Sequence, residues 1–462
     1  MNEAEVVAAL QARAHRFPTM IGIFLGGALC LHLAAIVFLV WGDTLPAATC
    51  FLVGQFLVGL SLLRLVDGAF VFQDIRLFFL IFFFLYGATL PLIVVSGLGG
   101  GIPGIDGAAF MYGTAILGFN VVQWWYRQPW HDVPMSVFDR YRPSFANAVV
   151  LFLGFLSAVF FALSRGVVFS FTIDRWQATR LTTQGWVVLM FVMNGLAMYM
   201  MIGWRNLTRQ ARVLLFISLA AFIALELFFG NRRDFLSMFV FLAGVVATKR
   251  HSIVRLKTVL TGAFIFVSLT VMGVVRQMMD TPMLILGDPL KLLVTQNEFV
   301  SPIQTLMFYV HNQAPLRWGS TYFMAPTLFI PRAFWPEKPE SLSIQFMRTA
   351  FGTTGIMGYA YTPVTEALLN FGFIGPFVVF SILSILMVKL VKNADRVPGF
   401  YFLCFAFVVD FNRGDVGGLF YSLVVAGFAF WFMAKVSRLR WAPRMLRDAW
   451  PSSPRAETVP AV

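Results

Sequence analysis

Five arginines are the residues best suited to chemistry in this sequence. They are Arg232 and Arg233 in Gly-Asn-Arg-Arg-Asp, Arg276, Arg332 in Ile-Pro-Arg-Ala-Phe-Trp-Pro, and Arg413 in Asn-Arg-Gly-Asp. A guanidinium group stays charged at low dielectric, and its planar fork donates two parallel hydrogen bonds to a phosphate. Each arginine alone could anchor a helix end or pair with a nearby aspartate. Five that converge on one cavity would instead bind a diphosphate.

Two further side chains are candidates for proton transfer. Glu366, in Tyr-Thr-Pro-Val-Thr-Glu, has few charged neighbours in the sequence, and His311 is the second candidate. Either group, placed beside a hydroxyl, can act as a general base. Either can also cap a helix or lie at a membrane interface, so the sequence does not decide between them.

The sequence lacks the motifs that indicate a metal site or a nucleotide-binding site. It contains no Asp-x-Asp pair, no His-Glu-x-x-His and no Walker motif. We therefore expect no metal and no cofactor.

The composition is that of an integral membrane protein. Of 462 residues, 59% are hydrophobic and 12% are charged, whereas a soluble domain is roughly 45–50% apolar and about 25% charged. The formal net charge of +13 could suggest nucleic acid. However, the basic residues form short clusters between apolar stretches, as in loops that orient a membrane protein, so we expect no nucleic-acid partner.

A helix needs about 20 residues to cross the apolar part of a bilayer. That length predicts an all-α protein with about twelve transmembrane helices, at 20–41, 46–64, 77–97, 107–126, 145–163, 185–203, 212–229, 233–249, 257–275, 372–391, 398–412 and 418–435. We expect one transmembrane domain over 1–435, with a large external loop at 276–371, and a basic tail at 436–462. The loop is far longer than an ordinary connection, which indicates a functional or internally folded segment.

Loop charges predict the orientation. Clusters of Lys and Arg at 205–212, 249–257 and 389–396 lie on the same side as both termini, and by the positive-inside rule that side is cytoplasmic. The five arginines then fall on the outer side, where short loops should avoid them. Two of the predicted helices, 234–249 and 398–412, are short. Arginines at their outer ends would therefore lie below the membrane surface, where a charge needs a cavity or a partner.

Several segments resemble the Wzy-type bacterial polysaccharide polymerases. The similar elements are Phe-Ile-Pro-Arg-Ala-Phe-Trp-Pro-Glu-Lys-Pro at 329–339, the stretch 358–366, Asn-Phe-Gly-Phe-Ile-Gly at 370–375 and Gly-Asn-Arg-Arg at 230–233. The resemblance covers about residues 220–430, and the first 200 residues match only in helix pattern.

This resemblance implies a GT-C-like, metal-independent, inverting glycosyltransferase of the bacterial inner membrane, with a periplasmic active site. Its substrates would be oligosaccharide repeat units linked to undecaprenyl diphosphate, and a chain-length regulator and a flippase would be possible partners. The five arginines would hold the donor diphosphate, Glu366 or His311 would be catalytic, and the glycan would contact Trp335, Tyr359 and Asp415.

Two other functions use similar groups. An O-antigen ligase takes the same lipid-linked donor, although the Trp-Pro loop element favours a polymerase. A flippase or transporter of lipid-linked oligosaccharide also needs a cationic cavity, but such carriers usually show internal repeats, which this sequence lacks.

The predicted topology can be tested with single cysteines at Ser320 and Ser437 in a chain that lacks Cys30, Cys50 and Cys404. Because 320 should be external and 437 cytoplasmic, an impermeant thiol reagent applied to intact spheroplasts should label only the first. Labelling of 437 without 320 would reverse the orientation.

Overall fold

The computed structural model describes residues 3–97, 101–131, 133–167, 185–228, 232–248, 299–330, 334–352 and 360–438, and every regular element within them is a helix. The first half contains α1 (Glu3–Trp41), α2 (Thr44–Asp67), α3 (Ile75–Val95), α4 (Ile105–Tyr126), η1 (Met135–Arg140), α5 (Phe145–Ser164), α7 (Gly185–Ile202), η2 (Trp204–Asn206), α8 (Arg209–Phe228) and α9 (Arg232–Thr248). The second half contains α12 (Ser301–Asn312), α13 (Ser320–Met324), η4 (Ala325–Phe329), α14 (Leu342–Phe351), α15 (Pro363–Phe371), η5 (Gly372–Ile374), α16 (Gly375–Lys392), α17 (Pro398–Phe411) and α18 (Val416–Val436).

The chain is an all-α polytopic membrane protein. Within the described residues, seven helical segments are long and apolar enough to cross a membrane, and three shorter apolar helices accompany them. Helices occupy eleven of the twelve predicted segments, while 257–275 lies outside the described residues. The two segments predicted to be short are short: α9 has 17 residues and α17 has 14.

Two helices differ from the prediction at their ends. Helix α1 begins at Glu3 rather than near residue 20, because its Ala-, Glu- and Gln-rich start has high helix propensity. The predicted helix at 372–391 is observed as η5 followed by α16, and α15 precedes it within the predicted loop. Gly372 has a positive φ of 64°, a conformation in which an α-helix cannot continue.

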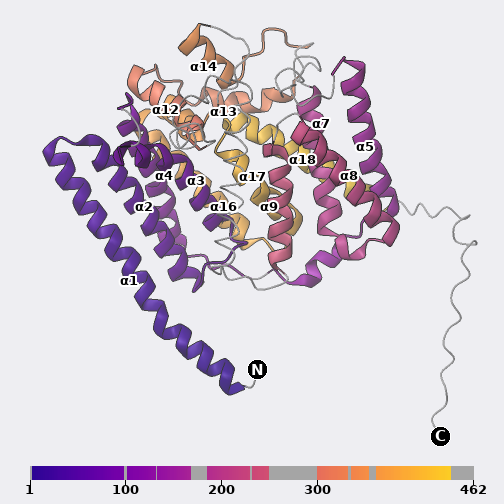
Figure 1. Cartoon of the computed structure of the whole chain (residues 1–462), viewed down its shortest axis with the longest axis horizontal. Coiled ribbons are helices and arrows are strands. Elements are labelled where there is room, and N and C mark those ends of the chain that lie inside the picture. Colours follow the sequence, from indigo (N-terminus) through magenta and orange to yellow (C-terminus); the bar gives the residue numbers. More distant parts are fainter. Residues whose placement is uncertain are drawn as a thin grey trace, which may run out of the picture.

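Helix α17 lies at the centre of the bundle, and nearly all of its residues are buried. It packs against α3 on one side and against α9 and α18 on the other. Figure 1 shows α1, α2 and α4 at one edge of the molecule and α5, α7 and α8 at the opposite edge. Close approach depends on small residues: Gly118 of α4 faces the carbonyl of Phe377, and Gly195 of α7 faces that of Ala426.

Hydrogen bonds between helix ends define two ends of the bundle. At the first end, which we call the basic end, Asn147 Nδ2 at the start of α5 donates to the carbonyl of Met433 near the end of α18. The Tyr199 hydroxyl, near the end of α7, donates to Ser437 Oγ. Basic residues gather at this end: Arg64, Arg76, Arg127, Arg140, Arg142, Arg205, Arg209, Arg212, Lys389, Lys392, Arg396, Lys435 and Arg438.

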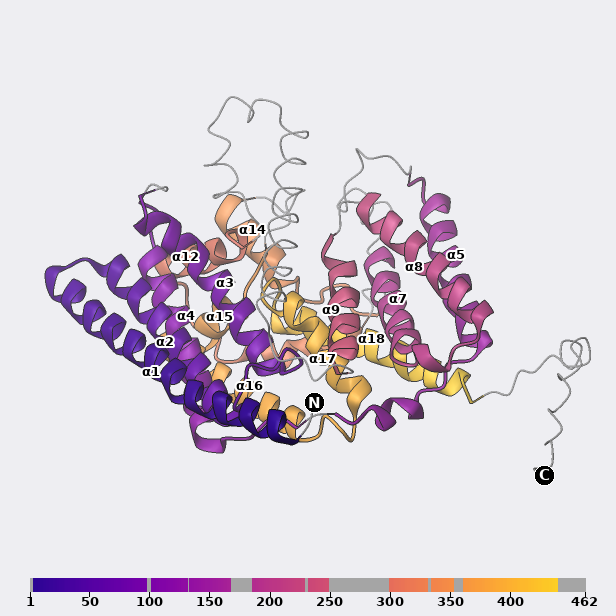
Figure 2. The same ribbon diagram turned by 60° about the horizontal axis from the view of Figure 1, so that its bottom comes forward.

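At the opposite end, which we call the cavity end, the starts of α2 and α4 meet through a hydrogen bond from Thr44 Oγ1 to Asp106. Helix α12 packs against α3, α4 and α15 there. Part of the predicted loop 276–371 is therefore internally folded, as α12 to α15. In Figure 2, α14 lies at the top of the molecule and α16 at the bottom.

A buried ion cluster ties helices together at the basic end. Arg76 has no solvent exposure, and its guanidinium contacts Asp74 Oδ2 at 2.7 Å and Asp67 Oδ2 at 3.1 Å. It also donates to the carbonyl of Gln128 at 2.5 Å. The Tyr401 hydroxyl of α17 accepts from the backbone of Ile75 next to it. One arginine thus joins the α2–α3 turn to the segment after α4.

We predict that Arg76→Met destabilises the protein by about 3–5 kcal/mol, because it leaves two buried carboxylates without their cation. The thermal unfolding midpoint of the purified protein in detergent measures the loss. Arg142→Met is the matched control, since Arg142 is exposed and its removal should leave the midpoint nearly unchanged. Equal midpoints for the two variants would contradict a structural role for the cluster.

Candidate functional site

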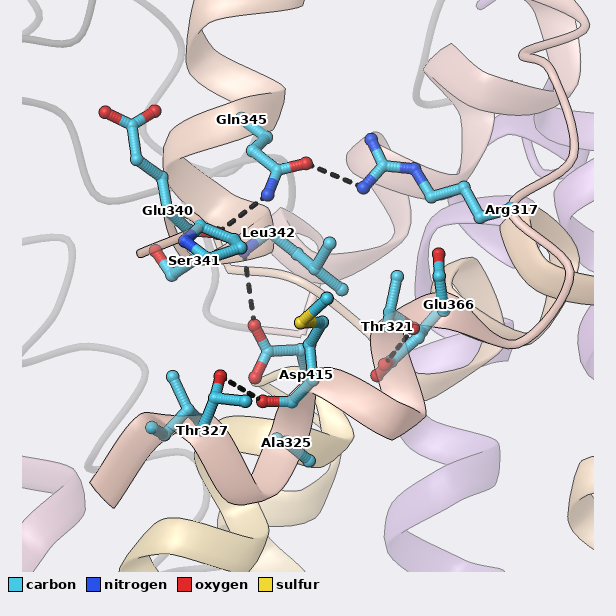
Figure 3. A pocket seen from close by; sticks show the side chains of 15 residues that line it. Arg317, Thr321, Ala325, Thr327, Glu340, Ser341, Leu342, Gln345, Glu366 and Asp415 are labelled. Carbon is cyan, nitrogen blue, oxygen red and sulfur yellow. Dashed lines mark hydrogen bonds between the residues drawn. The ribbon is translucent and has the colours of Figure 1, made fainter. Parts of the chain in front are cut away.

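A polar cavity of about 220 Å³ opens at the cavity end of the bundle. Its walls come from α13, η4, α14, the residues that precede α13 and α14, and the first turns of α15 and α18, and Figure 3 shows the side chains that line it. The lining residues are Arg317, Ser320, Thr321, Met324, Ala325, Thr327, Leu328, Pro339, Glu340, Ser341, Leu342, Gln345, Glu366, Asp415 and Gly417.

Helix α15 carries the most deeply buried acid of this cavity. The helix begins at Pro363, where the missing N–H costs nothing, and Thr362 caps it by accepting from the backbone N–H of Thr365 at 3.1 Å. Every residue from 360 to 370 is buried. Glu366, in the first turn, is only 1% exposed, so the carboxylate is not an interfacial one.

Both carboxylate oxygens of Glu366 accept hydrogen bonds. Thr321 Oγ1 donates to Oε1 at 2.6 Å, and the backbone N–H of Val416, in the first turn of α18, donates to Oε2 at 2.6 Å. The unpaired N–H groups at a helix N-terminus favour a negative charge. Within the described residues, the carboxylate is therefore held by neutral donors.

Asp415 is the second acid of the cavity and the N-cap of α18. Its Oδ1 accepts from the N–H of Gly418 at 2.5 Å and its Oδ2 from that of Leu342 at 3.4 Å. Burial raises the pKa of this carboxyl above its ordinary value, and the two backbone hydrogen bonds only partly oppose the rise. The two acids share one helix terminus.

Arg317 brings a positive charge to the same cavity. Its Nη1 donates to Gln345 Oε1 of α14 at 2.6 Å, and Gln345 Nε2 donates to the carbonyl of Glu340 at 2.7 Å. The nearby ion pair, between Arg348 and Glu340 at 2.8 Å, does not involve Arg317. A guanidinium bound to a neutral amide retains donors that an anionic ligand can use.

The structure brings together only some of the predicted site residues. Glu366 and Asp415 both line the cavity. His311 is exposed at the end of α12, beside Gly104, and is not a lining residue. Trp335 is half-buried in the segment between η4 and α14, and Arg413 is half-buried in the turn between α17 and α18.

The other predicted residues cannot be placed in the cavity. Arg232 and Arg233 begin α9, and nothing is described of their side chains, whereas Arg276, Arg332 and Tyr359 lie outside the described residues. Sequence reasoning missed Arg317, Thr321 and Gln345. Arg317 was detectable, because it is one more cation on the predicted outer side. Thr321 and Gln345 carry no comparable signal.

The comparisons with known proteins identify no relative: no family model matches the chain, and no curated protein or solved structure is significantly similar to it.

We predict that Asp415→Asn stabilises the protein at neutral pH, because asparagine is an equally good N-cap and carries no charge to bury. A carboxyl whose pKa is raised on folding binds more protons folded than unfolded, so its presence costs stability as pH rises above the unfolded pKa of about 3.9. Thermal midpoints of variant and wild type should coincide below about pH 4 and diverge above it, by on the order of 2 °C.

The control for this comparison is Glu337→Gln, which alters an exposed acid in the segment between η4 and α14. It should show no such divergence. A lower midpoint for Asp415→Asn throughout this pH range would mean that the carboxylate stabilises the fold.

Proposed function

We propose that the chain is a metal-independent, inverting glycosyltransferase that polymerises oligosaccharide repeat units carried on undecaprenyl diphosphate. The observation that carries the proposal is the cavity itself, which is lined by a buried carboxylate, Glu366, and by Arg317, whose side chain bonds to the neutral amide of Gln345. A base and a cation in one recess at an end of a transmembrane bundle suit a reaction of lipid-linked phosphate esters. The sequence resemblance to Wzy-type polymerases supports the same reaction.

In this reaction Glu366 takes the proton of an acceptor hydroxyl on the nonreducing end of a lipid-linked repeat unit. The acceptor oxygen forms a bond to the anomeric carbon of the donor glycan, on the face opposite the diphosphate. The bond from that carbon to the diphosphate oxygen breaks, and undecaprenyl diphosphate leaves. Arginine donors stabilise the negative charge that develops on the leaving oxygen.

Four arginines are proposed to bind the donor diphosphate, and the structure describes the surroundings of only some of them. Arg317 lines the cavity. Arg413 follows α17, and Arg232 begins α9, a helix joined to α17 by a hydrogen bond from Ser237 Oγ to Asp410 at 2.9 Å. Arg276 remains a candidate from the sequence. We assign the donor diphosphate to this group and the glycan to the polar walls around Asp415.

The proposed orientation places the basic end in the cytoplasm and the cavity end in the periplasm, with both termini cytoplasmic. It follows from the concentration of Lys and Arg at the basic end, which the positive-inside rule assigns to the cytoplasm. The cavity then faces the side on which the lipid-linked repeat units would be joined.

We predict that the purified chain in nanodiscs elongates lipid-linked glycans by whole repeats, with one undecaprenyl diphosphate released for each repeat. The substrate is the undecaprenyl-diphosphate-linked oligosaccharide extracted from cells that lack the chain. Elongation should proceed in EDTA and without a nucleotide sugar. Glu366→Gln should slow it by about 10²–10⁴-fold, the usual contribution of a general base. Glu340→Gln, an acid of the same cavity, should slow it far less.

Other outcomes select other functions. Transfer of the glycan only to a lipid A core acceptor would identify a ligase, and movement of the lipid across the bilayer without a new glycosidic bond would identify a transporter. A requirement for a divalent metal would contradict arginine as the sole electrostatic catalyst.

A further inference from the structure

The hydrogen bonds around Glu366 continue beyond its first partner. Asn370, one turn further along α15 and fully buried, donates from Nδ2 to Thr321 Oγ1 at 2.7 Å. The same Nδ2 donates to the backbone carbonyl of Glu366 at 2.8 Å. A carbonyl oxygen only accepts, so the atom that faces it must be the amide nitrogen. The orientation of the Asn370 side chain is therefore determined by its surroundings.

This orientation sets the direction of the next hydrogen bond. A hydroxyl has one proton to donate and two lone pairs to accept with. Because Thr321 Oγ1 accepts from Asn370, its own proton is free to point at Glu366 Oε1, 2.6 Å away. This series of hydrogen bonds therefore has one direction, from the Asn370 amide through the Thr321 hydroxyl to the Glu366 carboxylate.

Both oxygens of Glu366 then face donors, since Val416 N–H occupies Oε2. Two donors on opposite oxygens favour the ionised carboxylate and restrict rotation of its plane. Figure 3 shows Thr321 and Glu366 side by side at the cavity wall. The acid that must accept a proton is thus held with a fixed orientation toward the substrate space.

Docking of the loop onto α15 does not require these side chains. The backbone N–H of Arg317 donates to the carbonyl of Leu369 at 2.8 Å, and that of Trp318 donates to the carbonyl of Asn370 at 3.1 Å. Gly319, at a φ of 81°, then turns the chain into α13, which carries Thr321. Two backbone hydrogen bonds therefore attach the segment around residues 317–319 to α15, and neither of them involves a side chain.

Asn370 also carries an unsatisfied atom, because its Oδ1 is buried without a hydrogen-bond partner among the described residues. A buried acceptor left unpaired is unfavourable, and an apolar side chain at this position would avoid it. The amide at position 370 is therefore useful because its N–H group donates hydrogen bonds.

We propose that Thr321 and Asn370 are positioning residues that act through Glu366, holding its carboxylate oriented to accept the acceptor proton. The inference rests on the proposed function, because it assumes that Glu366 is the base. Neither residue needs to touch the substrate at the reacting atoms for this role.

The test uses the nanodisc assay with the same extracted lipid-linked oligosaccharide, and measures initial rates of undecaprenyl diphosphate release. Thr321→Val keeps the side-chain shape but removes the donor. We expect kcat to fall about 100-fold, the effect of a misplaced catalytic group, with KM within about twofold. Thr321→Ser restores the donor and should recover kcat to within about threefold of wild type.

Thr349→Val is the matched control. Thr349 is an exposed residue of α14 that does not line the cavity, and its hydroxyl donates to the carbonyl of Gln345, not to a carboxylate. It should leave kcat nearly unchanged. Asn370→Leu removes the first donor of the chain and should lower kcat less than Thr321→Val, since the Thr321 hydroxyl can still donate.

A double-substitution cycle separates positioning from an independent role. If Thr321 acts through Glu366, then adding Thr321→Val to Glu366→Gln should cause no further loss of rate. An equal fold-loss in both backgrounds would overturn the inference, as would full activity of Thr321→Val. Full activity of Glu366→Gln, or no product from wild type, would instead contradict the proposed function.

Monodisperse elution and an unchanged thermal midpoint for each variant exclude misfolding as the cause of a lost rate. If Thr321→Val alone misfolds, the kcat values of Thr321→Ala and Asn370→Leu are compared with wild type instead.

Discussion

The cost of removing a charged group from water without a partner is the constraint on which this structure depends. Arg76 shows how the fold meets it, because a guanidinium with no solvent exposure is enclosed by two aspartates and a backbone carbonyl. These partners come from the ends of separate helices. Satisfying one charge therefore also fixes how those helix ends lie at the basic end.

The cavity end meets the same constraint in another way. Glu366 is buried as deeply as Arg76, yet its partners are a hydroxyl and a helix N-terminus, both neutral. A carboxylate paired with arginine is stabilised as an anion and accepts a proton poorly. Hydrogen bonds from neutral donors also favour the anion, but without the full opposing charge of an arginine. The two ends therefore differ in that Arg76 is balanced by opposite charges, whereas Glu366 is held by neutral donors among the described residues.

Helix α17 connects the two ends. It is too short for an ordinary membrane crossing and almost wholly buried. Its first turns reach the Arg76 cluster through Tyr401, and its last turn reaches α9 through Asp410. Because α17 is enclosed by other helices, it need not match the thickness of the lipid.

The sequence by itself determined the class of the protein and most of its helices. Apolar length is a local property, because each turn of a membrane helix satisfies its own backbone hydrogen bonds. Helix ends were less predictable: α1 begins at Glu3, although the apolar stretch that predicted it starts near residue 20. Glu366 was found because it is the least paired acid on the predicted outer side, whereas Asp415 was named through the family resemblance.

Only the tertiary structure decided which of the candidates meet. His311 and Glu366 were equivalent as possible bases, but the packing of α12 leaves His311 exposed while α15 buries Glu366. Thr321 and Asn370 lie 49 positions apart, and although Asn370 begins the Asn-Phe-Gly-Phe-Ile-Gly element, nothing in the sequence pairs it with Thr321. Their role arises from a hydrogen-bond direction, which requires three side chains to be placed to within a few tenths of an ångström. Such placement is a product of packing between helices, and no local pattern encodes it.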